Sequence, residues 1–545
     1  MEKSVKVLSS YPCMAEAVRA AYRAGEDDET LEPLIRADRQ GRPVGRIGAG
    51  HYVIFYDLRG EREIELTESF TAPNFDRFPT LGRRVHFVTM IQYAPHLDVR
   101  VAFPPLGPVR DGLCETVSRH GRRQVKIVES EKAVHLRFFL NGKVEEPFPG
   151  EEWIFPETRK DIARFDEAPE MSLGQVADAA IARLQGDRDD LIVVNFANVD
   201  VLGHLENEAA IRRAVEAVDA HIGRLLAAAR QAGVIALITA DHGTVEEWLY
   251  PEGTINTGHT ANPVPCILVD PTLPAGSEVT LRPAGELADV APTVLHLLGL
   301  PPPAAMTGRS LLQHDPPWPA GQRRRVLLLI ADGWGWREER QGNLIAQAHT
   351  PVMDRLQAEC PTTRLQSWGE AVGLPPGTVG NSEVGHLHLG AGRRIPSDRL
   401  RIQQALEDGS FFQNEAFLGA MRGARREGVP LHLLGIISFF SSHGTIDYAL
   451  HLLRLAAREG LREVYVHGLL GRRGERPDSG AHYVERIEAE ARRLGVGQVA
   501  SLIGRFWALD REGNWDRIEK TYRALVYGEG RRVQLREPEG RQETL

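Results

Sequence analysis

Short apolar runs alternate with longer amphipathic stretches along the middle of the chain. The apolar runs have strand length, and they predict buried strands at residues 85–91, 124–130, 191–197, 234–240, 264–270 and 326–331. The amphipathic stretches predict helices at residues 171–184, 206–232 and 287–298. Alternation of strands and helices is typical of α/β domains built on a parallel sheet. We therefore expect an α/β fold for this part of the chain.

The same alternation is present towards both ends of the chain. A helix at 15–24 and a strand at 51–56 are predicted near the start, and a second alternating region at 431–508 contains strands at 431–437 and 463–469. The segment QHDPPWPAGQ, residues 313–322, is rich in proline and lacks periodicity, so we expect a linker there. Residues 531–545 are polar and are expected to form a frayed tail.

Composition narrows the class of protein. A chain of 545 residues is too long for one compact core, so two to four domains are expected. The net charge of −9 argues against a nucleic-acid partner. The four cysteines are scattered and form no CxxC pair, as in proteins of a reducing compartment. Since the first residues lack an apolar signal segment and the apolar runs have strand length, we expect a cytoplasmic, monomeric protein without membrane contact.

Carboxylate and imidazole residues follow the predicted strands. Open α/β sheets place ligand sites at the carboxyl ends of their strands. Carboxylates gathered at such an edge repel one another unless a cation lies among them. Carboxylates and imidazoles without thiolates suit Mn²⁺ or Zn²⁺ better than Ca²⁺, and there are enough of them for two ions. The candidate residues are Asp332, Asp241, His242, Asp200, His204 and His259.

A glycine-rich stretch, GNSEVGHLHLGAG at residues 380–392, contains Ser382 near its start. One interpretation is an ordinary loop whose serine caps a helix. The other is a nucleophile, because serine needs activation and a pair of divalent ions both clamps a phosphoryl group and lowers the pKa of a bound hydroxyl. A helix that begins at Ser382 would also direct backbone N–H groups at phosphate oxygens. With the candidate metal ligands, the residues predict phosphoryl transfer through a phosphoserine.

At this point a family resemblance can be stated. The chain resembles cofactor-independent phosphoglycerate mutase, of the alkaline phosphatase superfamily, over roughly residues 5–530. The matching motifs are ADGWG, GNSEVGHLHLGAGR, NFANVDVLGH, TADHG, GHTANPVP, LADVAPTVLHLLGLP, MTGRSLL, ESEKAVHLRFFLNGKVEEPFPGE and GRFWALDREGNWDRIEKTYRALVYGEG. Jointly these motifs are highly specific.

The motifs occur in a rotated order. In the family the DGWG strand opens the chain and MTGRSLL closes it, whereas here MTGRSLL precedes the proline-rich linker and DGWG. The resemblance therefore implies a circular permutant of two α/β domains. We expect a phosphatase-like metal domain at 96–396, with the linker 313–322 at the permutation joint. A smaller transferase-like domain would be assembled from 1–95 and 397–530, followed by the tail at 531–545.

The resemblance also implies roles for individual residues. One metal ion would be held by Asp332, Ser382, Asp241 and His242, and the other by Asp200, His204 and His259. Mn²⁺ is expected, with Zn²⁺, Co²⁺ or Mg²⁺ as alternatives. From spacing alone, Arg59 and Arg62 indicate either an anion site or the charged start of a helix. The substrate residues that the family implies are Arg59, Arg62, Lys132, Arg473, Arg505 and Arg511, together with His443 as a catalytic residue.

Two departures from the family lie on the transferase side. The family's SDGGVHSH is SFFSSHGT here, so Phe439 and Phe440 replace an acidic residue and a glycine, although His443 is kept. The family's GRD is Arg472-Arg473-Gly474, without the aspartate that meets the glycerate hydroxyls. Loss of such a hydrogen-bonding partner can change specificity by orders of magnitude. These positions make the acceptor substrate an open question.

The function expected from the sequence is interconversion of 3-phosphoglycerate and 2-phosphoglycerate through phosphorylated Ser382. The departures keep open a metal-dependent phosphatase or phosphotransferase that acts on a related phospho-acid or phosphonate. A third alternative, a catalytically silent binding module, conflicts with the seven metal-ligand residues that are present. In each enzymatic case the partner is a small phosphorylated acid.

Overall fold

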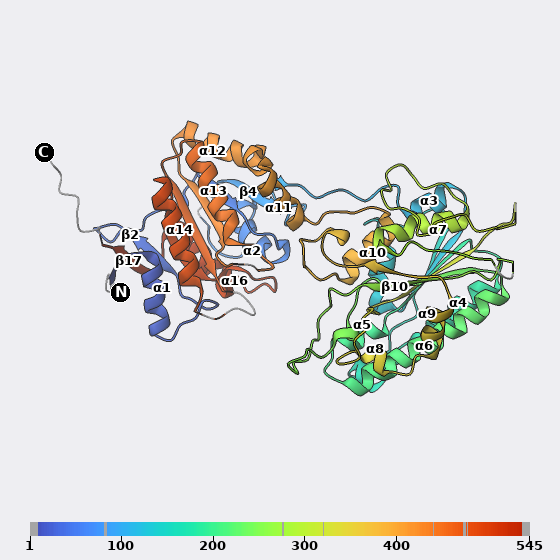
Figure 1. Cartoon of the computed structure of the whole chain (residues 1–545). Coiled ribbons are helices and arrows are strands. Elements are labelled where there is room, and N and C mark those ends of the chain that lie inside the picture. The colour runs from blue at the N-terminus through green and yellow to red at the C-terminus, as the bar shows by residue number, and fades with distance from the viewer. Residues whose placement is uncertain are drawn as a thin grey trace. The chain divides into compact units, whose positions relative to one another are not determined.

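The computed structural model describes residues 9–80, 84–274, 277–319, 321–439, 441–471, 476 and 478–536. The chain divides into two compact units (Figure 1). The continuous unit is Leu106–Arg401, and the split unit combines Met1–Pro105 with Ile402–Leu545. Each unit is an α/β fold around its own sheet, which confirms the predicted fold class. The predicted domain boundaries after residues 95 and 396 lie ten and five residues before these divisions.

An eight-stranded sheet forms the centre of the continuous unit, in the order β11-β13-β10-β9-β12-β8-β6-β7. The strands are β6 (Gln124–Ile127), β7 (Glu151–Ile154), β8 (Leu191–Phe196), β9 (Ile235–Thr239), β10 (Val264–Val269), β11 (Ala284–Glu286), β12 (Val326–Ala331) and β13 (Thr362–Gln366). The run from β9 to β7 is parallel, whereas β10 pairs antiparallel with both β9 and β13. The expectation of a parallel sheet is therefore correct for five strands and wrong for β10, because β10 turns back beside β9 without a crossover helix.

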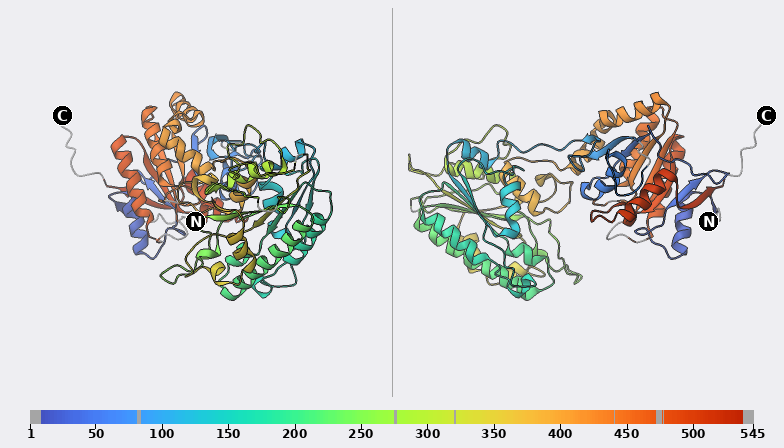
Figure 2. Two further views of the ribbon diagram at one scale, coloured as in Figure 1. Left: turned by 45° about the vertical axis from the view of Figure 1, so that its right-hand side comes forward. Right: turned by 180° about the vertical axis from the view of Figure 1, so that it is seen from behind.

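Helices cover both faces of this sheet, as Figure 1 and, from behind, Figure 2 show. One layer contains α4 (Leu173–Gln185), α5 (Asn198–Gly203), α6 (Glu208–Gln231), α8 (Leu344–Gln347) and α9 (Pro351–Glu359). The other contains α3 (Leu113–Arg119), α7 (Val290–Leu298) and α10 (Ser382–Ala391). Every residue of β12 and β8 is buried, as expected for continuous apolar strands covered on both faces.

The split unit has a nine-stranded sheet in the order β1-β17-β2-β16-β15-β14-β3-β4-β5. The strands are β1 (Ser9–Tyr11), β2 (Leu34–Ala37), β3 (Tyr52–Phe55), β4 (His86–Ile91), β5 (Arg100–Phe103), β14 (Leu431–Ile436), β15 (Val464–Leu470), β16 (Gln498–Gly504) and β17 (Arg531–Leu535). Strand β3 pairs parallel with β14, with Tyr52 opposite Leu431. The two distant parts of the chain therefore share one sheet and are not separate domains.

Helices also cover both faces of the second sheet, and each face has its own apolar core. One face carries α1 (Met14–Arg23), α12 (Glu415–Glu427), α13 (Ile446–Arg458) and α14 (Gly480–Leu494). The other carries α2 (Gly60–Thr71), α15 (Arg505–Ala508) and α16 (Trp515–Tyr527). Helix α11 (Asp398–Asp408) spans the division between the units.

The last described segment differs from its prediction. Residues 531–535 were expected to lie in a polar tail, but they form β17, which pairs parallel with both β1 and β2. Only Val533 of this strand is fully buried, so its sequence carries little apolar signal. The strand forms despite this weak apolar pattern because its backbone pairs with β1 on one side and β2 on the other. The rest of the predicted tail, residues 537–545, lies outside the described residues.

The predicted linker packs against the continuous unit. Trp318 donates a hydrogen bond from Nε1 to Oδ2 of Asp270 at 2.8 Å, and the guanidinium of Arg324 lies 4.0 Å from the centroid of the Trp318 ring.

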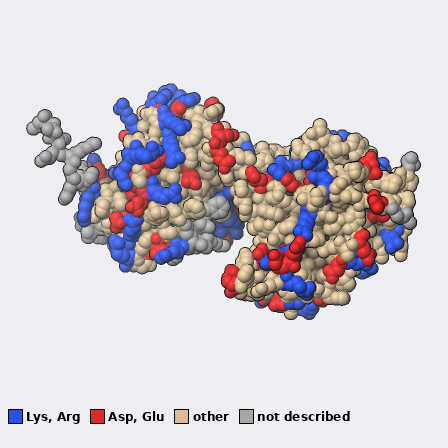
Figure 3. All heavy atoms as spheres, viewed as in Figure 1, with Lys and Arg blue, Asp and Glu red and all other residues tan. Residues whose placement is uncertain are grey.

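On the face drawn in Figure 3, basic and acidic side chains are interspersed. None of the helices within the described ranges combines the length and the apolar character that a bilayer-spanning segment needs.

Candidate metal centre

Four neighbouring parallel strands each lead into one residue or pair of the candidate site. In the order β9-β12-β8-β6, these strands are followed by Asp241 and His242, Asp332, Asp200, and Lys132. Because the strands are parallel and adjacent, their carboxyl ends meet at one edge of the sheet. The structure therefore brings the predicted strand-end residues together at one edge, although the sequence contained no information on strand order.

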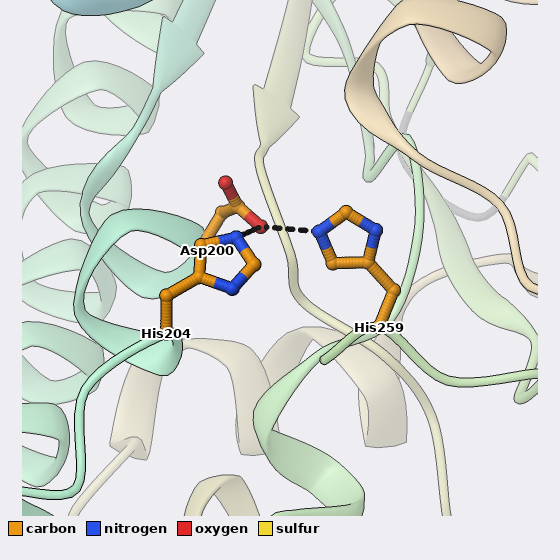
Figure 4. Close-up of side chains that lie close together, drawn as sticks. All are labelled: Asp200, His204 and His259. Atoms are coloured by element: carbon orange, nitrogen blue, oxygen red, sulfur yellow. Dashed lines mark ion pairs between the residues drawn. The ribbon is translucent and has the colours of Figure 1, made fainter. Parts of the chain in front are cut away.

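Asp200 is the centre of the first ligand group, drawn in Figure 4. Its Oδ1 lies 3.2 Å from Nε2 of His259 and 3.4 Å from Nε2 of His204. His204 follows the single turn of α5, which begins at Asn198, so both side chains lie on one helical face as their spacing predicted. Nδ1 of each of these two histidines contacts a main-chain oxygen. For His204 this is the oxygen of Thr257, 2.8 Å away. The other ring nitrogens are thus directed at the shared carboxylate.

A second group surrounds the ring of His242. Its Nε2 lies 3.4 Å from Oδ2 of Asp241 and 3.6 Å from Oδ1 of Asp332. Two glycines allow the close packing around these carboxylates. Gly333 has φ 82°, and a Cβ there would lie 2.9 Å from the Cα of Asp200. At Gly385 of α10 a Cβ would lie 2.6 Å from the main-chain oxygen of Asp241.

Ser382 is the first residue of α10, whose N-cap residue Asn381 accepts a hydrogen bond from the N–H of Val384. The serine is therefore inside the helix and does not cap it. Its Oγ lies 2.7 Å from Nζ of Lys132 and 3.1 Å from Nε2 of His242. The structure thus brings the candidate nucleophile into contact with the buried ammonium group of Lys132 and with His242, a candidate metal ligand.

Lys132 offsets part of the negative charge at this edge. Its Nζ lies 2.7 Å from Oδ2 of Asp200 and 3.1 Å from Oδ1 of Asp332. Burial opposes the charge on Lys132, but attraction to Asp332, Asp200 and Asp241 outweighs it and raises its pKa. Burial likewise opposes the charge on Asp200, but Lys132 and the imidazoles hold the pKa of that carboxyl well below its usual range. Asp332 differs, because burial and repulsion from Asp241 raise its pKa.

The residues fit divalent cations. Oδ2 of Asp241 and Nε2 of His259 are buried and have, within the described part of the chain, only ion-pair contacts of 3.2–3.4 Å in the cluster, as atoms that bind a metal would. The donors are carboxylates and imidazoles, which suit Mn²⁺ and Zn²⁺. Among the described residues, the groups with ligand spacing at this edge are Asp200-His204-His259, Asp200-His242-Asp332 and Asp241-Asp332-His386.

Two side chains that touch this centre were missed in the sequence. Nδ1 of His386 lies 3.2 Å from Oδ2 of Asp241, and Nδ2 of Asn195 donates to Oδ2 of Asp332 at 2.9 Å. His386 follows Ser382 by four residues, so its helical spacing could have indicated a common face. Asn195 lies within the apolar run of β8, and its sequence context carries no comparable signal.

Of the predicted substrate residues that the structure describes, those other than Lys132 lie in the split unit. Nη1 of Arg59 lies 3.4 Å from Oγ of Ser442, and Nη1 of Arg62 donates to the main-chain oxygen of Leu509 at 3.1 Å. Ion pairs connect Arg505 to Glu29 and Arg511 to Glu61, both at 2.7 Å. The positive charges of Arg505, Arg59 and Arg62 all act on buried His443. Arg473, Gly474 and Phe440 lie outside the described residues.

Two family models match the chain. One, described as the metalloenzyme superfamily, matches residues 68–302. The other, described as the N-terminus of BPG-independent PGAM, matches residues 3–95 and 402–542. The chain therefore contains a segment similar to the metalloenzyme superfamily and a second segment, split in the sequence, similar to the N-terminus of BPG-independent PGAM. The class of protein that it resembles is a metalloenzyme with a second α/β domain.

The curated relatives are named 2,3-bisphosphoglycerate-independent phosphoglycerate mutases. The protein of Syntrophotalea carbinolica is 43% identical over 307 residues, 56% of this chain and 58% of its own length. That of Thermomicrobium roseum is 43% identical over 302 residues, 54% and 57% of the two lengths. The chain thus spans little more than half the length of these relatives. It resembles cofactor-independent phosphoglycerate mutases, in circularly permuted order, because the second family match is interrupted by the continuous unit.

Among solved structures, one of Leishmania mexicana phosphoglycerate mutase at low cobalt concentration is similar at 26% identity and a TM-score of 0.37. The match covers 51% of this chain and 53% of the other. A similarity of this size supports no conclusion about the arrangement of the fold.

Proposed function

We propose that this chain is a phosphoglycerate mutase that interconverts 3-phosphoglycerate and 2-phosphoglycerate through a phosphoserine at Ser382. The observation that carries the proposal is the position of Ser382 Oγ, 2.7 Å from the Lys132 ammonium and 3.1 Å from His242. The similarity to relatives named as phosphoglycerate mutases supports the choice of substrate.

The proposed site holds two divalent cations, Mn²⁺ in the first instance. One set of ligands is Asp332, Ser382, Asp241 and His242, and the other is Asp200, His204 and His259. Bound cations would stabilise negative charge on a phosphoryl group and lower the pKa of the serine hydroxyl. The buried carboxylate oxygens and ring nitrogens that lie close together and the absence of thiolates in these sets support this assignment.

The protein groups have separate tasks in the proposed reaction. Lys132 donates a hydrogen bond to Oγ of Ser382 and so stabilises the serine as an oxyanion. The first turn of α10 directs backbone N–H groups at a phosphate on Ser382. The arginines of the split unit, Arg59, Arg62, Arg473, Arg505 and Arg511, bind the carboxylate and phosphate of the substrate, because guanidinium forks bind such groups in bidentate fashion. His443 exchanges a proton with the glycerate hydroxyl.

The test is incubation with ³²P-labelled 3-phosphoglycerate in the presence of Mn²⁺. The wild-type chain should acquire label at Ser382 and release 2-phosphoglycerate, detected by an enolase-coupled assay, whereas Ser382→Ala should do neither. A useful control is Ser277→Ala, because Ser277 lies outside the helices and strands and its side chain is in none of the described contacts of the cluster at the strand ends. The proposal is wrong if the wild-type chain with Mn²⁺ forms no 2-phosphoglycerate.

A second candidate is a metal-dependent phosphatase or phosphotransferase that acts on a related phospho-acid or phosphonate. The observation that favours it is Phe439, whose side chain is 61% exposed at the position where the family has an acidic residue. An exposed aromatic ring there would suit an acceptor other than glycerate. Phosphate release from small phosphoesters in excess of isomerisation would favour this candidate over the mutase.

A further inference from the structure

The split unit contains a buried cluster of titratable side chains. Asp57 follows β3, Glu63 lies on α2, and His443 lies in the loop between β14 and α13. All three are almost completely buried, and one ligand-type atom of each lies within 4.8 Å of the others. These residues come from segments that are far apart in the sequence. The cluster is therefore a product of the fold.

Each carboxyl group of the cluster has one oxygen with a described hydrogen-bond partner and one without. Nδ1 of His443 lies 2.7 Å from Oε1 of Glu63, and Oδ1 of Asp57 accepts a hydrogen bond from the N–H of Ile436 at 2.7 Å. The second oxygens, Oε2 of Glu63 and Oδ2 of Asp57, have no hydrogen-bond partner in the described part of the chain. The main-chain oxygen of His443 accepts from the N–H of Leu58, which fixes the loop to the end of β3.

Burial limits the negative charge that the two carboxyl groups of this cluster can carry. Burial raises the pKa of both Asp57 and Glu63 well above the usual range, and Glu63 raises that of Asp57 further. Two carboxyl groups so close in a buried site do not both ionise, so the pair carries at most one negative charge. Of the two, Glu63 is the carboxyl on which Arg59 and Arg62 act, against the effect of burial, to favour the ionised form.

The imidazole of His443 is neutral in this environment. Burial, followed by the positive charges of Arg505, Arg59 and Arg62, lowers its pKa to about 3, against the opposing effect of Glu29. A neutral imidazole has one N–H, and an ionised carboxylate can only accept a hydrogen bond. With Glu63 as the ionised member of the pair, the 2.7 Å contact holds the proton on Nδ1.

We propose that Glu63 is a positioning residue that accepts the Nδ1–H of His443 and leaves Nε2 as the atom that exchanges a proton with the substrate. Asp57 keeps the cluster at a single negative charge. The inference rests on the proposed function for its reaction, but the tautomer that it assigns can be measured in the absence of any reaction. Glu63 would thus orient the base His443, as the third member of a catalytic triad orients its histidine.

The proton transfers balance in both directions. When glycerate accepts the phosphoryl group, its O–H bond breaks and the proton moves to Nε2. The hydroxyl oxygen then bonds to phosphorus as the bond from phosphorus to the serine oxygen breaks. When the substrate donates the phosphoryl group, Oγ of Ser382 bonds to phosphorus and releases its proton to solvent, while Nε2 of His443 takes a proton from solvent and gives it to the departing glycerate oxygen. The only other participant is therefore water.

The first test compares two phosphoryl donors in Glu63→Gln. Departure of glycerate requires a proton, whereas p-nitrophenyl phosphate releases a stable anion that requires none. We expect kcat for isomerisation of 3-phosphoglycerate to fall by roughly 10²–10⁴-fold with little change in KM. First-turnover release of p-nitrophenol, which reports phosphorylation of Ser382, should change by less than about two-fold. Equal loss with both donors, or no loss with either, would contradict the proposal.

The matched control is Glu68→Gln on the same helix. Oε1 of Glu68 lies 2.8 Å from Nε2 of His96, so it also forms a glutamate–histidine pair, but at the surface. This variant should match the wild type with both donors. Because the control removes the same charge from the same helix, it separates the role of the buried pair from a general change in α2.

The second test is nitrogen-15 NMR of the full chain with labelled histidine, with the His443 signals assigned by their loss in His443→Gln. Wild-type His443 should be protonated at Nδ1 and unprotonated at Nε2 between pH 5 and 8, and Glu63→Gln should abolish this preference. Protonation at Nε2 in the wild type would overturn the proposal. If the wild type does not isomerise phosphoglycerate, the proposed function fails, and the NMR result still decides the role of Glu63.

Discussion

Replacement of Lys132 by methionine tests how the carboxylates at the strand ends are stabilised when no metal is bound. The ammonium contacts Asp200, Asp332 and Ser382, and only 6% of the residue is exposed. Methionine has a similar length and no charge, so the substitution removes the cation with little change in volume. The buried carboxylates would then lose the one lysine that contacts them among the described residues.

The expected magnitude follows from the burial of this ion pair. Removal of one partner of a buried pair destabilises a protein by about 3–5 kcal/mol, because the remaining charge is left uncompensated. For a unit of this size, that corresponds to a fall in Tm of roughly 5–8 °C. Mn²⁺ should raise the Tm of the variant more than that of the wild type. The cation binds only the folded form, and it no longer meets the repulsion of the ammonium.

The assay is thermal unfolding of both proteins in EDTA and in excess Mn²⁺. Lys160→Met is the matched control, because the side chain of Lys160 is 78% exposed in the same unit and its ion pair with Glu157 contributes little. We expect the control to keep the Tm of the wild type within about 2 °C in both conditions. If Lys132→Met behaves like this control in EDTA, the carboxylates are stabilised by something other than Lys132 and the reasoning is wrong.

Two further predictions concern packing and acid stability. Gly385→Ala places a Cβ 2.6 Å from the main-chain oxygen of Asp241 and should displace the start of α10, so labelling of Ser382 should fall at least about ten-fold. The control is Gly174→Ala on helix α4, where a Cβ meets no atom within 4 Å, and it should not change the labelling of Ser382. Equal labelling in both variants would refute the packing argument. In the split unit, burial lowers the pKa of His467 to about 3 and that of hydrogen-bonded His432 well below its usual range. The unfolded chain binds protons that the folded one excludes, so stability should be complete above about pH 6.5 and fall by up to about 1.4 kcal/mol per pH unit for each histidine below it. Urea unfolding at pH 7 and pH 5 should show a weaker pH dependence in His467→Gln than in the wild type, and an unchanged dependence would contradict this explanation.

The candidate site of the continuous unit could be predicted from the sequence because its chemistry is local to strand ends. Each of Asp200, Asp241 and Asp332 directly follows an apolar run, and a parallel sheet gathers such positions at one edge whatever the strand order. The strand order itself, with β12 between β9 and β8, depends on long-range pairing and has no local signal. His386 was missed for a different reason, since its motif was interpreted only through its serine.

The cluster of Asp57, Glu63 and His443 could not be predicted in this way. Glu63 and His443 are 380 residues apart, and their contact depends on the pairing of β3 with β14. In the sequence, Glu63 is one of several acidic residues in an amphipathic helix, a position that is usually exposed. Only its complete burial distinguishes it from its neighbours. Residues that support a catalytic group are harder to predict than the group itself, because their role comes from the fold and not from a motif.

The permuted order is compatible with an intact site because the altered connections lie away from the strand ends that carry chemistry. Leu312, just before the linker, pairs with Leu281, and the chain then reaches β12, which enters the sheet at Val326 between β9 and β8. In the split unit, β1 pairs parallel with β17, so the first and last described strands lie side by side. A permutation requires that both the old and the new pairs of chain ends lie close together. The pairing of β1 with β17 meets this condition in the split unit, and Asp332 follows β12 at the edge that Asp200 and Asp241 share, so this order of segments is compatible with a site assembled around Ser382.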